Sequence, residues 1–120
     1  MTPRTPASDA ADFLPLKPVW FHILLSLSQQ PAHGYAIRQS VQARTGGRIQ
    51  LWPATLYGSI SELQDGGLIE EWKPRGVQDE LTRRFYRLTA LGGRVLRAET
   101  DRLEDLVGLA RAATGRRRVT

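Results

Sequence analysis

The sequence contains no cysteine, only two histidines and no long apolar run. Without cysteine the chain has no disulfides, no thiolate nucleophile and no cysteine-based zinc site. Its longest apolar stretch, residues 19–25, is far shorter than the roughly 20 residues that a membrane-spanning helix needs. Residues 1–12 lack the apolar segment of a secretory signal. We therefore expect a cytoplasmic protein with no membrane partner.

Motifs of catalysis are missing as well. The sequence has no glycine-rich phosphate loop, no paired-carboxylate motif and no metal-ligand spacing. Two histidines and no cysteine leave few candidates for a nucleophile or a general base. The sequence thus predicts a protein that is not an enzyme and that uses neither a cofactor nor a metal ion.

The charge of the chain is basic but unevenly spread. Its 120 residues are enough for one domain with one core, and they carry a formal charge of +5. A basic balance favours nucleic acid as a partner. However, the last ten residues hold four arginines and no acid, and without them 13 basic residues face 12 acidic ones. An argument for DNA binding must therefore rest on where individual charges lie.

Hydrophobic periodicity divides the chain into a small domain and a long final helix. Residues 1–12 are expected to form a disordered arm. Helices are predicted at 18–28, 33–45, 53–65 and 90–113, a short strand around Ile49 and Leu51, and further strands at 68–73 and 83–88. This order predicts a mainly α fold with a small β-hairpin (α+β), a winged helix-turn-helix, at 13–89. A C-terminal dimerisation helix at 90–113 and a frayed basic tail at 114–120 follow.

Proline and glycine mark the ends of the predicted helices. Pro18 and Pro53 suit a first helical position, where the missing N–H has no partner in any case. Glycine pairs at 46–47 and 66–67 suit helix ends. The first helix is apolar nearly all round, which predicts a buried central helix. Its one histidine, His22, is expected to be hydrogen-bonded in the core rather than to act as a ligand.

The third predicted helix has the chemistry of a DNA-recognition helix. Leu56, Ile60 and Leu63 recur at i, i+4 and i+7 and predict its buried stripe. Small side chains on the outer face, among them Thr55 and Ser59, would let it sit deep in the major groove. Their hydroxyls could reach phosphates or base edges. Small residues also occur on exposed helix faces simply because such positions tolerate them, so a helix face without a DNA-binding role stays open as the alternative.

Three ring-bearing residues flank this helix or begin the one before it. His33 and Tyr35 begin the second helix, where an imidazole and a phenol can donate to phosphate. Tyr57 lies beside the buried stripe of the third helix. Both a core role and a DNA contact are open for Tyr57.

The predicted hairpin supplies basic charge. It holds Lys73, Arg75, Arg83, Arg84 and Arg87, against Asp79 and Glu80. Basic side chains at a hairpin tip reach phosphates or a narrow minor groove, and Arg75 and Arg83 lie closest to the loop, followed by Arg84. The alternative is a hairpin whose charges are simply solvated.

The last helix carries a seam of apolar and small residues at alternating spacings of four and three. These residues are Gly92, Leu96, Glu99, Leu103, Leu106, Ala110 and Ala113. Such a seam is typical of helix-to-helix packing, and Leu96, Leu103, Leu106 and Ala110 are our predicted dimer contacts. The seam could instead pack on its own domain, but about 24 residues span about 36 Å, longer than so small a domain.

Six short stretches resemble the PadR-like transcription regulators, in the short form with a single C-terminal helix. They are Ile23-Leu24-Leu25-Ser26-Leu27, His33-Gly34-Tyr35-Ala36-Ile37, Thr45-Gly46-Gly47, Thr55-Leu56-Tyr57, Leu63 through Gly66-Gly67-Leu68-Ile69-Glu70, and Arg83-Arg84-Phe85-Tyr86-Arg87-Leu88-Thr89 followed by Gly92. Together they cover about residues 16–110 in the family's order.

The resemblance implies a homodimer, held by the C-terminal helix and helped by the first, that binds promoter DNA. It implies a repressor that is often released by a small aromatic or amphiphilic effector. Carried over by position, Tyr35, Thr55 and Tyr57 would lie at the DNA face, and Arg83 and Arg84 in the wing.

Two departures from the family pattern bear on these expectations. Ala54 stands where the family usually has glycine, which leaves DNA binding possible with an altered geometry. Residues 90–120 contain no aromatic side chain, which argues against a flat effector stacked on that helix. Trp20 and Trp52 could line an effector pocket or simply belong to the core. The alternative function is a winged helix that binds protein, or a small-molecule sensor with weak DNA affinity.

Overall fold

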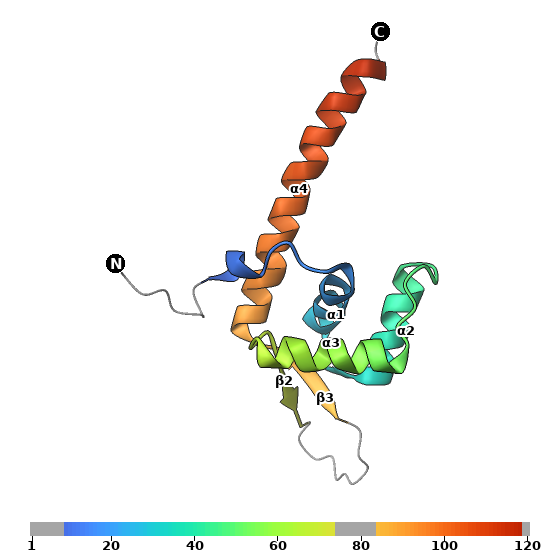
Figure 1. Ribbon diagram of the computed structural model, residues 1–120, viewed down its shortest axis with the longest axis vertical. Coiled ribbons are helices and arrows are strands. Elements are labelled where there is room, and N and C mark those ends of the chain that lie inside the picture. The colour runs from blue at the N-terminus through green and yellow to red at the C-terminus, as the bar shows by residue number, and fades with distance from the viewer. Residues whose placement is uncertain (1–8, 74–83, 119–120) are drawn as a thin grey trace, which may run out of the picture.

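The computed structural model describes residues 9–73 and 84–118, with side chains up to residue 115. Its elements are η2 (Ala10–Phe13), α1 (Pro18–Gln29), β1 (Ala32–His33), α2 (Gly34–Arg44), α3 (Pro53–Asp65), β2 (Ile69–Trp72), β3 (Phe85–Leu88) and α4 (Ala90–Arg118). In Figure 1, α1 to α3 and the strands form a small body from which α4 projects. The mainly helical α+β class with a β-hairpin is confirmed.

The core is built from one stripe of each of the first three helices. On α3 this stripe is Leu56, Ile60 and Leu63, as predicted, and all three are almost fully buried. The first helix is less enclosed than its sequence suggests. It buries Ile23, Leu24, Ser26 and Leu27, while its other apolar side chains are only partly covered. The expectation of a helix buried all round was therefore wrong, because the small body covers only one side of α1.

The sheet has three antiparallel strands in the order β1-β3-β2. Its third strand is the two-residue β1, where Ala32 lies opposite Tyr86 and His33 opposite Phe85. The strand expected around Ile49 and Leu51 does not form. Those residues lie in the loop before α3, where Thr45 Oγ1 accepts from the Ile49 N–H at 3.1 Å and Leu51 fills the core.

The start of α4 is fixed against the end of α3. Thr89 caps the helix, since its Oγ1 accepts from the Gly92 N–H at 2.9 Å and donates to the Gly67 carbonyl at 2.6 Å. A Cβ at position 92 would press into the Leu68 carbonyl. Glycine is therefore required at the very position where a capping box would place glutamate.

Both ends of the chain are more regular than expected. The arm predicted through residue 12 gives way at Ala10 to η2, which packs against α4. The last helix runs to Arg118 instead of residue 113, so part of the predicted frayed tail is helical. Of the helices in the described ranges, none is both long and apolar enough to cross a membrane.

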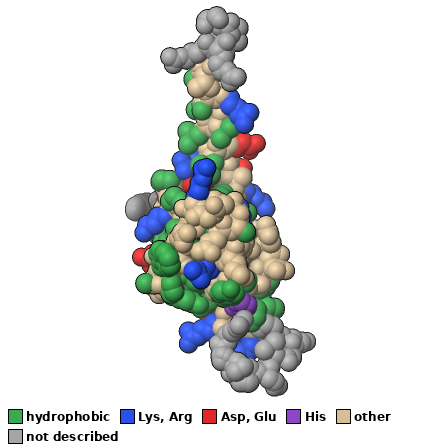
Figure 2. Space-filling view, turned by 90° about the vertical axis from the view of Figure 1, so that its right-hand side faces the viewer, with side chains coloured by type: hydrophobic (Ala, Val, Ile, Leu, Met, Phe, Trp, Pro, Cys, Tyr) green, Lys and Arg blue, Asp and Glu red, His purple; other side chains and the backbone are tan. Residues whose placement is uncertain are grey.

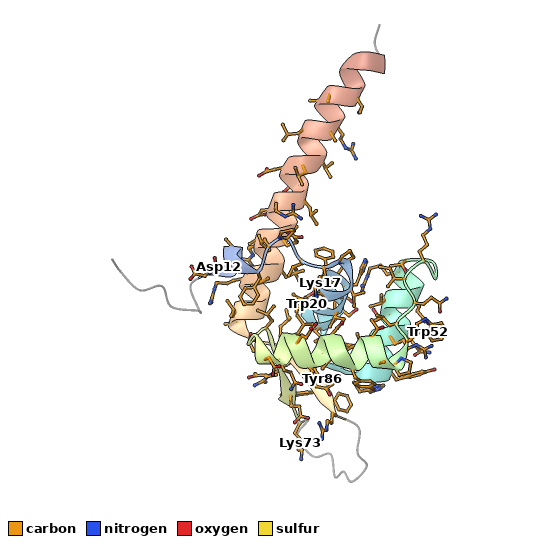
Figure 3. All side chains as sticks on the ribbon, in the orientation of Figure 1. Asp12, Lys17, Trp20, Trp52, Lys73 and Tyr86 are labelled. Carbon is orange, nitrogen blue, oxygen red and sulfur yellow. The ribbon has the colours of Figure 1, made fainter. Side chains whose placement is uncertain are left out.

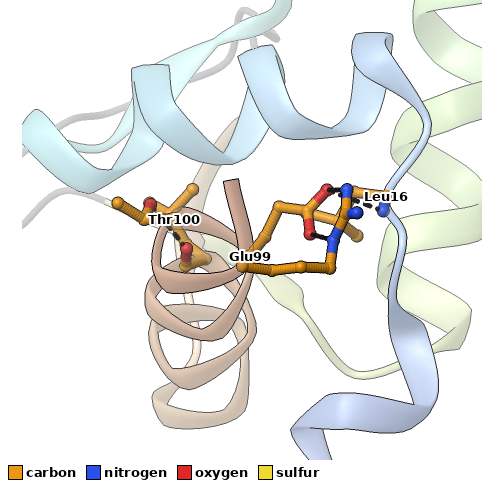
Figure 4. Close-up of polar contacts among 5 residues, drawn as sticks. Leu16, Glu99 and Thr100 are labelled. Carbon is orange, nitrogen blue, oxygen red and sulfur yellow. Dashed lines mark hydrogen bonds and ion pairs between the residues drawn. The ribbon is translucent and has the colours of Figure 1, made fainter. Parts of the chain in front are cut away.

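Glu99 ties α4 to the segment before α1 (Figure 4). Its side chain is 2% exposed and accepts from the Leu16 N–H at 3.1 Å and from Arg102 at 2.6 and 2.9 Å. The bond from Arg102, partly offset by burial, holds the pKa of Glu99 below its ordinary value. Glu99 thus interrupts the apolar seam because it is used inside the protomer.

Candidate nucleic-acid interface

The outer side of α3 is exposed and carries short side chains. Helix α3 lies across the lower part of the body in Figure 1, above the β2–β3 hairpin. Ala54, Thr55 and Gly58 are exposed, so the surface of a large partner molecule can approach the backbone of the helix there. Ser59 is an exception, because it is only 8% exposed beside the core stripe. Its expected position on the outer face was wrong, since it follows Leu56 by three residues and shares its side of the helix.

Tyr57 both packs and remains exposed. A Cβ on Gly34 would lie 2.5 Å from the Tyr57 hydroxyl, so the ring lies directly over the first residue of α2. At the same time 51% of Tyr57 is exposed. The absence of a side chain at Gly34 therefore lets Tyr57 of α3 pack closely against the start of α2. The sequence had left a core role and a DNA contact as alternatives; Tyr57 does not belong to the buried core, and the DNA contact stays a prediction.

The start of α2 presents a second tyrosine to solvent. Tyr35 is 53% exposed, and Gln39 Nε2 donates to its hydroxyl oxygen at 3.0 Å. Next to it, His33 is half-buried and caps α2, with Nδ1 accepting from the Ala36 N–H at 3.2 Å. The His33 ring also meets Phe85 edge-on. Tyr35 is thus free to meet a ligand, whereas His33 Nδ1 is occupied in the fold.

The basic side chains of the described hairpin are partly matched by acids. Arg84 Nε lies 3.3 Å from Glu71 Oε2, and Arg87 Nε lies 2.8 Å from Glu70 Oε2. Lys73 is exposed at the end of β2, and Figure 3 draws it pointing away from the body. Arg75 and Arg83, two predicted contacts, lie outside the described residues. The sequence interpretation overlooked Glu70 and Glu71, although strands joined as a hairpin bring such residues opposite the arginines.

Two arginines of α2 have opposite surroundings. Arg44 donates to Ser26 and Ser40 at 3.1 and 3.0 Å and lies 3.3 Å from His22 Nδ1. Burial, together with the charge of Arg44, lowers the pKa of His22. His22 is therefore hydrogen-bonded between α1 and α2, half-buried rather than deep in the core. Arg38, in contrast, is half-buried and has a buried Nε without an acceptor among the described residues.

The projecting part of α4 keeps apolar side chains in contact with solvent, as the stalk in Figure 2 shows. Leu103, Leu106, Val107 and Leu109 are all exposed large apolar residues, and Ala110 lies on the same stretch. Leu96 differs from the other predicted dimer contacts because it packs against the core of its own chain. We call Leu103, Leu106, Val107 and Ala110, which lie on one side of the helix, the α4 apolar face.

The two tryptophans considered for an effector pocket do not meet. Trp20 is half-buried against the core, with Lys17 Nζ 5.0 Å from its ring centre. Trp52 is 60% exposed at the N-terminal end of α3. Figure 3 draws the two apart, Trp20 by α1 and Trp52 at the outer end of α3. Of the described residues, no group of three or more His, Asp or Glu could hold a metal ion.

Solved structures share this fold. A PadR-like transcription factor from Bacteroides fragilis superposes with a TM-score of 0.66 at 22% identity, covering 79% of this chain and 88% of the other. A PadR family regulator from Clostridium difficile gives 0.68 at 18% identity, over 82% and 99% of the two chains. Bacillus subtilis PadR in complex with operator DNA gives 0.60 at 24% identity, over 70% and 47%.

One relative in sequence is an uncharacterized 37.1 kDa protein in transposon TN4556 of Streptomyces fradiae, 31% identical over 86 residues. The match takes in 72% of this chain but only 23% of that relative, so the chain spans about a quarter of its length. The model of the transcriptional regulator PadR-like family matches residues 23–98, more than half of the chain, and takes in the second half of α1, all of α2 and α3, the hairpin and the start of α4. The chain belongs to the transcriptional regulator PadR-like family.

Proposed function

We propose that this protein is a cytoplasmic promoter-binding repressor that acts as a homodimer. The observation that carries the proposal is the outer side of α3, which is exposed, lined with short side chains and flanked by Tyr35 and Tyr57. Helix α3 has 13 residues and is about 20 Å long, and the major groove is about 12 Å wide and admits one helix. The solved relative in complex with operator DNA supports this assignment.

Within this proposal the two parts of the surface have different tasks. Thr55 and Tyr57 on α3 and Tyr35 on α2 face the groove and its edge, where hydroxyls reach base edges or phosphates. The wing, with Lys73, Arg84 and the neighbouring Arg75 and Arg83, contacts the flanking backbone or minor groove. Because α3 itself carries no lysine or arginine, the cationic contribution comes from outside the recognition helix.

The homodimer is proposed to form through the α4 apolar face. Four exposed large apolar side chains on one short stretch are more than the surface of a monomeric protein ordinarily shows. A second copy would cover them by helix-to-helix packing. Two copies then present two α3 helices to two half-sites, as two-fold symmetric DNA-binding proteins do.

Release by a small effector is proposed to involve Trp20, which lies on α1 and is only half-buried. Trp52 is too far out on α3 to share that site (Figure 3).

Fluorescence anisotropy on tiled upstream DNA fragments tests the function. We expect tight binding to a few fragments, with affinity falling steeply as salt rises, because each phosphate contact releases counterions. Equal, weak binding to all fragments that disappears when residues 116–120 are removed would instead mean that only the basic C-terminal residues bind DNA. That result would favour the alternative, a winged helix whose partner is a protein.

A further inference from the structure

Arg38 is a half-buried charged side chain for which the described residues supply no acceptor at Nε. Its Nε is buried and has no hydrogen-bond acceptor in the described part of the chain, and its guanidinium forms no ion pair there. Arg44, six residues later on the same helix, is more exposed yet donates to two serine hydroxyls and a backbone carbonyl. The described residues therefore supply hydrogen-bond acceptors to Arg44 and none to the Nε of Arg38.

Leaving Arg38 open costs stability. A buried donor on a charged group that lacks its acceptor costs the desolvation of that group. Because Arg38 is only half-buried, an anion from outside the chain meets the terminal N–H groups of its guanidinium, not the buried Nε. Because a guanidinium presents its N–H groups in a planar fork, it matches phosphate oxygens particularly well.

The neighbours of Arg38 on α2 favour an external acceptor. At 3.6 residues per turn, Tyr35, Arg38, Gln39 and Gln42 lie within a sector of roughly 100°, away from the buried Ile37 and Val41. Gln39 donates to the Tyr35 hydroxyl oxygen, so the proton of that hydroxyl remains available to a second acceptor. Tyr35 and Arg38 thus offer an O–H and N–H donors on one side of the helix.

This side of α2 adjoins the exposed side of α3. The Tyr57 hydroxyl of α3 lies over Gly34, the residue directly before Tyr35. A duplex that receives α3 in its major groove would therefore bring one strand of its backbone to the start of α2. Phosphate contacts of this kind fix the position of a protein on the duplex without reading its sequence.

We propose that Arg38, together with Tyr35, binds one backbone phosphate of the DNA and so positions α3 in the groove. The inference rests on the proposed function and adds a positioning residue to it. The acceptor is a phosphate oxygen of the duplex, and each protomer of the dimer binds one.

Salt-dependent anisotropy on Arg38→Ala tests the proposal, with Arg97→Ala as the matched control. Arg97 is exposed on α4, and its loss changes the net charge equally. Arg38→Ala should weaken binding about 10- to 100-fold on every fragment by the same factor. The slope of log affinity against log salt should become shallower by roughly 1.8, since each of two phosphate contacts contributes about 0.9. Arg97→Ala should leave both nearly unchanged.

Two further variants separate a DNA contact from a structural role. Arg38→Lys keeps the charge, so it should retain the salt slope while losing part of the affinity. Tyr35→Phe removes only the hydroxyl donor. Its loss of DNA affinity should be less than additive with that of Arg38→Ala, because both side chains bind one phosphate. Thermal unfolding should show that Arg38→Ala does not lower the melting temperature.

The outcomes separate this inference from the proposed function. If the wild type binds selected fragments and Arg38→Ala behaves like Arg97→Ala, the phosphate contact is wrong and the function stands. A loss confined to some fragments would also overturn it, because it would indicate a base contact. If the wild type binds no fragment at all, the proposed function fails and this inference fails with it.

Discussion

The two halves of α4 have opposite surroundings although they form one continuous helix. In the first half Val95 is fully buried, Leu96 packs on the core and Glu99 bonds to the segment before α1. In the second half Leu103, Leu106 and further apolar side chains face solvent. A helix of 29 residues, about 43 Å long, outruns the small body that it starts from. The comparison teaches that the first half belongs to the fold of one chain, whereas the second half leaves its apolar side chains exposed, as the proposed dimer requires.

The largest expected effect comes from charging the second half. Leu103→Asp places a carboxylate in the α4 apolar face, where a partner helix would have to desolvate it. We expect a monomer by light scattering and a loss of DNA affinity of about 100-fold or more, because two half-sites are no longer bound together. The melting temperature at low protein concentration should change little.

Ala112→Asp is the control for this variant. It adds the same charge to the same helix on the side opposite the α4 apolar face. It should remain a dimer and bind DNA as the wild type does. A dimeric Leu103→Asp would show that the protomers meet elsewhere.

A change in the first half should act on stability instead. Glu99→Gln removes the charge that accepts from Leu16 and Arg102, and it should lower the free energy of unfolding by about 2 kcal/mol. Chemical denaturation measures this loss. Since the contact lies within one protomer, the variant should still dimerise, and a monomeric Glu99→Gln would mean that the two halves of α4 are coupled.

The same residue predicts how stability depends on pH. The folded-state pKa of Glu99 lies below its ordinary value of 4.5, so its contribution is fully present above that pH and is lost as pH falls through the folded-state value. The difference in unfolding free energy between wild type and Glu99→Gln should therefore shrink below pH 4.5. A difference that stayed constant from pH 7 to pH 3 would contradict this account.

A smaller effect is expected at the N-terminal ends of α3 and α4, which differ in whether a side chain caps the helix. Thr89 caps α4 through its hydroxyl, whereas Trp52 at the start of α3 makes no capping hydrogen bond. Trp52→Ser supplies the missing acceptor and should raise the free energy of unfolding by about 1 kcal/mol. Trp52→Ala, which removes the ring without adding a cap, is the control. If both variants melt alike, the serine hydroxyl does not reach the helix N–H groups.

The smallest effect concerns the described part of the wing, where Arg84 and Arg87 are paired with acids. Glu71→Gln frees Arg84, and exposed ion pairs of this kind contribute only about 0.2–1 kcal/mol. We expect DNA affinity to rise by a few-fold in anisotropy at low salt and the gain to vanish at high salt. Asp101→Asn on α4 removes an equal charge far from the wing and on the side of the helix opposite Leu103. An equal gain in both variants would point to net charge alone.

Patterns that depend on one helix could be predicted from the sequence. The α3 stripe of Leu56, Ile60 and Leu63 follows from local spacing, and it was confirmed. Ser59 was misplaced because small polar residues are assigned to the outside by default, while its spacing from Leu56 puts it inside.

Features that join distant segments could not be predicted in this way. The bond from the Leu16 N–H to Glu99 spans 83 residues, and only the packing of η2 on α4 brings the two together. The strand β1 has two residues and therefore no alternation to detect. The Nε of Arg38 without an acceptor could not be predicted either, because a missing hydrogen bond is visible only once the neighbouring described residues have been placed.

Hydroxyl-radical footprinting of the wild type on its best-bound fragment tests the central claim most directly. A dimer that places one α3 in each of two major-groove segments predicts two protected half-sites on one face of the duplex. Their centres should lie about one helical turn, or a multiple of it, apart, and both should disappear together in Leu103→Asp. A single protected patch that Leu103→Asp leaves unchanged would contradict the claim that the open half of α4 pairs two DNA-binding surfaces.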